Sequence, residues 1–183
     1  MELRTPRLLL QEVSSTDLLL VHGLNSLPEV DEYNTLGIPE NLAATRRWLE
    51  EILIDQIATP QHRYVFKICE TENAEFIGLI GFTLGKVGYS SGEVWYKIMP
   101  AYWSRGFATE SVKSILEFGF GRLKLHRIEA GCATENTGSV RVLEKNGFTL
   151  EGRSRKLLPI RGNWVDNFRY AILEEDFTGS LTT

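Results

Sequence analysis

The segment Glu93–Val112, with the sequence EVWYKIMPAYWSRGFATESV, carries the strongest structural signals in the chain. Its first residues predict a strand over Glu93–Met99, which Pro100 ends. A short loop with Arg105 and Gly106 follows, and apolar residues then recur at the helical period. The first N–H groups of such a helix lack an acceptor within it, and its end carries partial positive charge. The junction is therefore suited to a phosphate or pyrophosphate, although an ordinary strand-to-helix turn is the alternative.

Before this junction the pattern is that of an antiparallel meander. Strands are predicted over Arg63–Cys69 and Phe76–Leu84, joined by the polar turn Glu70–Glu75. Earlier still we expect a strand, two helices and a loop: Leu8–Val13, Leu18–Leu24, Leu42–Ile57 and Asn34–Asn41.

After the junction, helical periodicity extends as far as Leu123. A strand is predicted over His126–Cys132, and a helix follows from its N-cap Asn136 to about Asn146, with Gly147 beyond its end. Two last strands are expected over Thr149–Leu157 and Asn163–Leu173. The whole is a mixed α/β domain with a largely antiparallel first half and a β-α-β crossover near Met99–Cys132.

Length and composition restrict the function classes. The chain has 183 residues, the size of one domain, and a formal net charge of −4. That charge argues against a protein held broadly to nucleic acid or to an anionic membrane. Cys69 and Cys132 lack metal-ligand spacing and suggest reduced thiols in a cytoplasmic protein. The sequence has neither a signal-peptide pattern at its start nor an apolar run long enough to span a membrane.

Two glycine-containing stretches fail as nucleotide-binding motifs. Gly81–Lys86 has the wrong spacing for a Walker loop, and Val87 stands where Ser or Thr is needed. Gly119–Lys124 lies in or at the end of a helix, with Lys in place of the third glycine of a dinucleotide loop. The predicted anion site therefore belongs neither to an ATPase nor to a Rossmann fold.

Three blocks resemble GNAT-type N-acetyltransferases. PAYWSRGFATE, Pro100–Glu110, looks like the coenzyme A loop, and it is most similar to that of the Rim-type subfamily, which acetylates N-termini of ribosomal proteins. His126–Gly152 resembles the subfamily's second signature, and Leu3–Val13 resembles the family's first strand. The positions that match in the second signature are Asn136, Ser139, Lys145, Gly147 and Phe148.

The resemblance implies one GNAT domain over residues 1–183, with a core at about 3–175. Its fold would be a mostly antiparallel twisted sheet flanked by helices, with a β-α-β core that binds acetyl-CoA. Backbone groups of Ile98 and Met99 would pair with the pantetheine amides where the strand splays from its neighbour. Asn136 would serve the pantetheine arm or the substrate. The loop residues expected at the pyrophosphate are Arg105, Gly106, Phe107, Ala108 and Thr109.

The implied reaction needs a base for the attacking amine and a proton for the leaving thiolate. Glu93, acting through water, is the candidate base; an exposed carboxylate at a strand end is the alternative. Ser139 is the candidate proton donor; a helix first-turn serine bonded to the backbone is the alternative. Many GNAT enzymes place a tyrosine four residues after this serine, but Leu143 stands here and cannot donate a proton.

The acceptor implied by the resemblance is a primary amine, above all a protein N-terminal α-amine. A small amine (polyamine, amino acid or aminoglycoside) and a sensor that binds acetyl-CoA without turnover are the alternatives. No metal, membrane or direct nucleic-acid partner is expected. The main basic cluster is Arg153, Arg155, Lys156 and Arg161. It has the pattern of an edge strand with solvated charge, and contact with ribosomal RNA phosphate is the alternative. Similar proteins are frequently dimers, so a homodimer is an open expectation.

Overall fold

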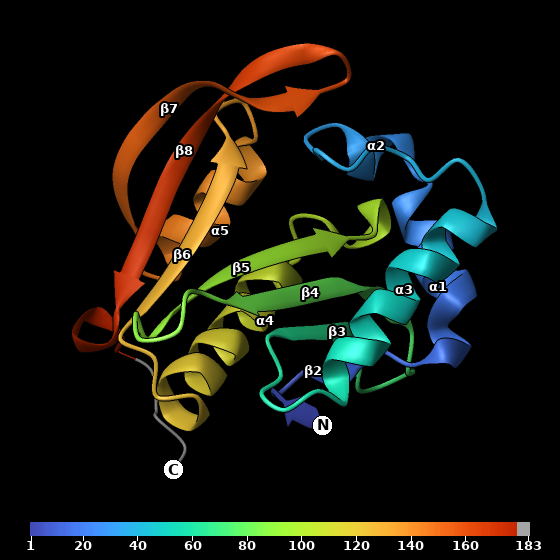
Figure 1. The fold of residues 1–183 in the computed structure, drawn as a ribbon, viewed down its shortest axis with the longest axis horizontal. Helices are drawn as coiled ribbons and strands as arrows, with labels where there is room; N and C mark the ends of the chain where they lie inside the picture. The colour runs from blue at the N-terminus through green and yellow to red at the C-terminus, as the bar shows by residue number, and fades with distance from the viewer. Residues whose placement is uncertain (179–183) are drawn as a thin grey trace.

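A computed structural model describes residues 1–178, and residues 179–183 of the predicted domain lie outside the described part. One mixed sheet of eight strands, in the order β1-β2-β3-β4-β5-β6-β8-β7, forms the centre of the molecule (Figure 1). The strands are β1 Glu2–Arg4, β2 Leu8–Glu12, β3 Arg63–Glu70, β4 Phe76–Leu84, β5 Ser91–Ile98, β6 Arg127–Ala133, β7 Thr149–Ile160 and β8 Asn163–Leu173.

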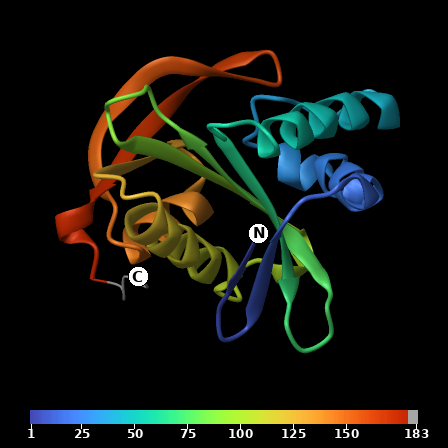
Figure 2. The same ribbon diagram turned by 60° about the horizontal axis from the view of Figure 1, so that its bottom comes forward.

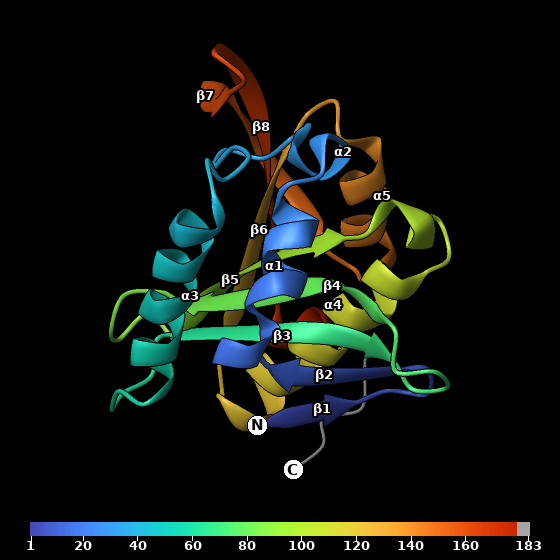
Figure 3. The same ribbon diagram turned by 90° about the vertical axis from the view of Figure 1, so that its right-hand side faces the viewer.

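Helices cover both faces of the sheet, with α1 and α3 on one face and α4 and α5 on the other (Figures 2 and 3). The α-helices are α1 Leu18–Asn25, α2 Pro28–Asp31, α3 Leu42–Gln56, α4 Phe107–Glu117 and α5 Thr137–Lys145. None of these described helices is long and apolar enough to cross a membrane.

Successive residues of the central strands are buried on opposite faces, because side chains alternate along a strand. Phe66 and Ile80 belong to the larger core cluster, which includes α4 residues such as Ile115. Val65 and Leu79 belong to a second cluster, formed with α1 and α3. Burial on both faces explains the nearly continuous apolar sequence of β4, since a strand covered on one face only would alternate.

β5 and β6 form the one parallel pair of the sheet, and the described pairs on either side are antiparallel. Their register covers only Ser91–Glu93 of β5 and Arg127–Glu129 of β6. Beyond these residues the two strands diverge, which Figure 1 shows as a V-shaped opening. The predicted β-α-β crossover and the splaying of the strand are both confirmed.

The predicted strands and helices are present, with ends that agree to within a few residues. The sequence did not predict β1 or the short helix α2. The helix predicted to reach Leu123 changes at Phe118 into a wider π-helical turn, Phe118–Arg122. In this turn a Cβ on Gly119 would lie 2.6 Å from Cδ1 of Ile128, so a larger residue there would make the end of that side chain move.

Candidate active site

The opening between β5 and β6 continues into a cleft of about 1270 Å³. Residues of β5, β6, α4 and α5 line one half of it, and residues of the α1–α3 region and of β7 line the other. We call these the cofactor half and the acceptor half. Of the ten site residues predicted from the sequence, eight line this cleft: Glu93, Ile98, Gly106, Phe107, Ala108, Thr109, Asn136 and Ser139.

The N-terminus of α4 forms one end of the cofactor half. Gly106 has a φ of 82°, a left-handed conformation that favours glycine, and precedes the helix as its N-cap residue. Within residues 1–178, no backbone carbonyl accepts a hydrogen bond from the N–H groups of residues 104–109. The first backbone bond of the helix runs from Glu110 to the carbonyl of Gly106, at 3.0 Å. This row of free N–H groups, with the positive end of the helix dipole, can hold an anion.

Arg7 ties the N-terminal segment to this loop, a role that the sequence reasoning missed. Its Nε donates to Glu110 at 2.7 Å, its Nη1 donates to the carbonyl of Arg105 at 3.2 Å, and its guanidinium lies 4.6 Å from the ring centre of Phe107. Burial alone would raise the pKa of Glu110, but hydrogen bonds from Thr5 and Arg7 outweigh it and hold that pKa below its usual value. Arg7 therefore holds the loop before α4 in place from the side of the N-terminal segment.

The Arg105 side chain lies outside the lining of the cleft. Its guanidinium is 5.3 Å from the ring centre of Tyr102 and 5.1 Å from that of Phe107. Arg105 thus lies in the loop just before α4, with its guanidinium packed on two aromatic rings.

Backbone groups along β5 alternate in direction. The Met99 N–H donates to the carbonyl of Ile77 at 2.8 Å, on the side of β4. Because bonding directions alternate along a strand, the backbone groups of Tyr96 and Ile98 face the other side, across the gap toward β6. No described strand pairs with this side of β5 beyond Glu93. The gap therefore exposes a strand edge to which an extended ligand with amide groups can bind.

Of the two residues predicted for the pantetheine amides, only Ile98 faces this gap. Met99 uses its N–H within the sheet, and its side chain packs against the cluster formed with α1 and α3. The Ile98 carbonyl accepts from Nε1 of Trp103 at 2.7 Å. The groups that remain for a ligand are the Ile98 N–H and both backbone groups of Tyr96.

Glu93 lies at the point where β5 and β6 separate. Its side chain is exposed into the cleft. The surrounding protein raises the pKa of Glu93 by desolvation, and the carboxylate of its cross-strand partner Glu129 raises it further. A carboxylate with a raised pKa is a better proton acceptor than an ordinary one, which suits a general base.

Ser139 lies in the first turn of α5 and is held there by an N-cap. The Asn136 side chain accepts from the Ser139 N–H at 3.0 Å, so the predicted capping by Asn136 is confirmed. Tyr96 of β5 donates from its hydroxyl to Oγ of Ser139 at 3.0 Å. Sequence reasoning missed Tyr96, because no local pattern joins a strand residue to a serine 43 positions later.

Polar contacts also shape the acceptor half. Lys97 donates to Asn25 at 2.6 Å, and burial lowers the pKa of this lysine to about 8. Asn167 of β8 lines the cleft, and only 6% of its surface is exposed. No described residue forms a hydrogen bond with its side-chain amide. Because no fully buried side-chain N or O atom in the described part of the chain lacks a partner, the amide of Asn167 is open to the cleft. Asn167 is therefore a candidate ligand-binding residue that sequence reasoning missed.

The tip of the β7–β8 hairpin lies near α2 (Figure 1). Nη2 of Arg161 donates to the carbonyl of Pro28 at 2.6 Å, and its Nε lies 3.5 Å from the buried carboxylate of Asp31. Arg153, from the same predicted basic cluster, forms an ion pair with Asp166 at 2.6 Å. These two arginines are thus neutralised within the protein.

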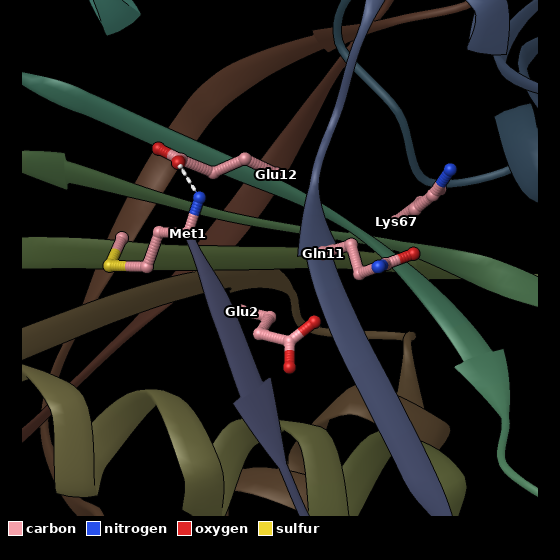
Figure 4. Close-up of a pocket in the computed structure, with 5 residues that line it drawn as sticks. All are labelled: Met1, Glu2, Gln11, Glu12 and Lys67. Atoms are coloured by element: carbon pink, nitrogen blue, oxygen red, sulfur yellow. Dashed lines mark hydrogen bonds and ion pairs between the residues drawn. The ribbon is translucent and has the colours of Figure 1, made fainter.

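Three other features of the described structure are the Cys132 thiol, the distribution of metal-ligand side chains and a smaller hollow. Burial raises the pKa of the Cys132 thiol to about 11, so this cleft residue is a protonated thiol at neutral pH. In residues 1–178, no group of three or more His, Cys, Asp or Glu side chains could hold a metal ion. A smaller hollow of about 370 Å³ lies by β1 and β2, where the Met1 amino group pairs with Glu12 at 2.6 Å (Figure 4).

The family model described as "Acetyltransferase (GNAT) domain" matches residues 7–149, so the chain belongs to the GNAT acetyltransferase family. Similar curated proteins are named N-acetyltransferases. Uncharacterized N-acetyltransferase p20 of Bacillus licheniformis is 28% identical over 177 residues, 97% of this chain and 98% of that protein. Uncharacterized N-acetyltransferase YoaA of Bacillus subtilis is 31% identical over 173 residues, 94% and 96% of the two chains. The chain is accordingly an N-acetyltransferase.

Solved structures agree on the fold. An acetyltransferase (GNAT family) from Bacillus anthracis is 31% identical, with a TM-score of 0.82 over 96% of this chain and 99% of the other. Spermidine N-acetyltransferase from Vibrio cholerae, in complex with CoA and spermine, is 26% identical, with a TM-score of 0.83 over 96% and 100%. Mycobacterium smegmatis RimJ, in complex with CoA-disulfide, is 22% identical and shares the fold, with a TM-score of 0.86 over 99% and 90%.

Proposed function

We propose that this chain transfers an acetyl group from acetyl-CoA to a primary amine. The observation that carries the proposal is the position of the open β5 edge beside the free N–H groups of α4. A strand edge suits the amide-bearing pantetheine arm, and a helix N-terminus suits the pyrophosphate. The two features share one cleft, and solved relatives contain CoA.

Every predicted site residue except Met99 has a role in this proposal. The N–H groups from Arg105 to Thr109 hold the pyrophosphate, Ile98 pairs with pantetheine, and Asn136 orders α5 beside it. Glu93 accepts the proton of the attacking amine through water. Ser139 donates to the departing sulfur.

For the acceptor, we propose a protein N-terminal α-amine, as in Rim-type enzymes. The supporting observation is the apolar surface of the acceptor half, where Leu36 is 73% exposed and Leu157 is 50% exposed. The side chains of a polypeptide would bury this surface, and burial of apolar area favours binding. A small polycation would gain little from it.

A polyamine is the second candidate acceptor, and the carboxylates of the acceptor half favour it. Glu29 and Glu32 line the cleft there, as does Glu135 at the end of β6. Desolvation raises the pKa of Tyr33, and the Glu32 and Glu135 carboxylates raise it further. Spermidine N(1)-acetyltransferase of Vibrio cholerae is 25% identical over 179 residues.

A thiol-release assay with acetyl-CoA tests these proposals on one panel of acceptors. N-terminal peptides with a free or a blocked α-amine are compared with spermidine, spermine, amino acids and aminoglycosides, and products are identified by mass. Release with free-amine peptides only supports the first acceptor, and release with polyamines only replaces it by the second. Tight acetyl-CoA binding with no release on any acceptor would instead support a sensor.

A further inference from the structure

Tyr96, on β5, carries a hydroxyl group that the mechanism above does not use. Its side chain lies on the face of the sheet that α5 covers, partly buried beside the larger core cluster. The hydroxyl donates to Oγ of Ser139 at 3.0 Å and lies 3.4 Å from the Ser139 carbonyl. Tyr96 and Ser139 both line the cleft. A strand residue and a helix residue are thus joined across the opening where β5 leaves β6.

This contact leaves the Ser139 proton available to a ligand in the cleft. A hydroxyl has one proton to give, and the Ser139 oxygen already accepts the proton of Tyr96. Among residues 1–178, the Ser139 hydroxyl has no acceptor of its own, and the Ser139 N–H is held by Asn136. A serine in a helix often donates to the carbonyl four residues earlier, but no such bond exists here. The Ser139 proton is therefore free to point into the cleft.

We propose that Tyr96 is a positioning residue, which aims the Ser139 hydroxyl at the leaving sulfur of the thioester and supplies it with a proton. This inference rests on the proposed acetyl transfer. In the step, the amine nitrogen bonds to the acetyl carbon, the carbon–sulfur bond breaks, and sulfur keeps the electron pair. Ser139 gives its proton to the sulfur, Tyr96 gives its own to Ser139, and the phenolate is reprotonated by solvent. The amine proton leaves through Glu93, so the products are the N-acetylated amine and the CoA thiol.

Steady-state kinetics of Tyr96→Phe, which removes only the hydroxyl, tests the role. We expect kcat to fall about tenfold with the KM for acetyl-CoA unchanged, because the lost hydrogen bond acts when charge develops on sulfur. In a Ser139→Ala background, Tyr96→Phe should change kcat by less than about twofold, because a residue that acts through Ser139 has nothing left to position. Tyr64→Phe is the matched control, since Tyr64 packs on Phe118 outside the cleft lining.

Three results would overturn the inference while the wild type still acetylates amines. They are an unchanged kcat in Tyr96→Phe, an equal loss in Tyr64→Phe, and a full additional loss when Tyr96→Phe is combined with Ser139→Ala. Melting temperatures of all variants separate a folding defect from a kinetic one. Ser139→Thr keeps a hydroxyl and should retain most of the Tyr96 effect.

A second measurement does not need an acceptor. The ultraviolet absorbance of the bound CoA thiolate is measured as a function of pH. The absorbance of the complex with desulfo-CoA is subtracted, which removes the signal of titrating protein groups such as Tyr96 and its neighbour Cys132. The acid dissociation constant of the bound thiol should be about tenfold larger in the wild type than in Tyr96→Phe or Ser139→Ala. Equal constants, or no binding of CoA at all, would refute the role of Tyr96. A positive result together with no acetyl transfer to any amine would refute only the proposed function.

Discussion

Glu93 and Glu129 are cross-strand partners at the last position where β5 and β6 pair. Beyond them the strands separate, and Glu93 lines the cleft that begins there. Glu129 is also bonded to Arg127 at 2.8 Å, whereas no described side chain of opposite charge pairs with Glu93. Glu129 thus has a cationic partner, whereas desolvation and the neighbouring Glu129 charge raise the pKa of Glu93.

We predict that Glu93→Gln lowers kcat by about a hundredfold, the usual size of a lost general base. It should also abolish the acidic limb of the pH–rate profile. In the wild type this limb should lie above the ordinary pKa of glutamate, because the base works only when deprotonated and its pKa is raised. The measurement is kcat against pH at saturating acetyl-CoA.

Glu129→Gln is the matched control for that profile. Removing the neighbouring negative charge lowers the pKa of Glu93, so the acidic limb should move to lower pH while the rate at alkaline pH stays the same. If the limb persists in Glu93→Gln and still moves in Glu129→Gln, another group is the base.

Local signals in the sequence were sufficient for the elements of the fold and for the cofactor end of the site. The strand ending at Pro100, the glycine before α4 and the cap at Asn136 each depend on a few neighbouring residues, and the structure has all three. β1 and α2 are only three and four residues long, too short for a period to be visible. Their existence depends on what they pack against.

The contacts that complete the site could not be predicted, because they join residues far apart in the sequence. Arg7 meets Glu110 across 103 positions. Asn167 reaches the cleft only because β8 pairs with β6, where its amide lies over Gly131. Whether the Met99 backbone faces β4 or the gap depends on its position along β5, because bonding directions alternate from one residue to the next. That position is set by the register with β4 and not by the residue type.

The loop before α4 gives a second prediction. Gly106→Ala should raise the KM for acetyl-CoA about tenfold, because a side chain at a φ of 82° strains the backbone that presents the free N–H groups. Gly88→Ala is a matched control: Gly88 has a φ of 88°, no atom within 4 Å of an added Cβ, and no place in the cleft lining. Both variants should lose about 1 kcal/mol of unfolding free energy. An equal rise of KM in both would show that the loop at Gly106 has no special role.

Asn167 gives a prediction about the acceptor. Asn167→Ala should raise the KM for the acceptor amine about tenfold and leave that for acetyl-CoA unchanged, because its amide is open to the cleft and has no hydrogen-bond partner within the described chain. Asn163→Ala removes an exposed amide from the same strand and should change neither constant. The measurement is initial rate with each substrate varied in turn. A rise in the KM for acetyl-CoA instead would assign Asn167 to the cofactor half.

Arg161 gives the last prediction, which concerns the contact between the β7–β8 hairpin and α2. Its guanidinium is half exposed, whereas its partner Asp31 is buried. The pair therefore holds the hairpin to α2 while its Arg161 side stays open to solvent. Arg161→Ala removes this ion pair, and within residues 1–178 the Asp31 carboxylate then keeps the hydrogen bond that Asn34 donates at 3.4 Å. We expect the KM for the acceptor to rise about fivefold while the KM for acetyl-CoA stays constant, because the contact closes only the acceptor half.

Arg155→Ala separates this contact from general charge. Arg155 is exposed on β7 and has no ion pair within residues 1–178. Arg155→Ala therefore changes the net charge as much as Arg161→Ala does, but it leaves the contact with α2 intact. In the wild type, salt should raise the acceptor KM, since screening weakens an exposed guanidinium contact, and this dependence should be smaller in Arg161→Ala. If Arg155→Ala raises the acceptor KM as much as Arg161→Ala does, the positive field of the hairpin acts on the acceptor directly, and the bridge to α2 does not control access.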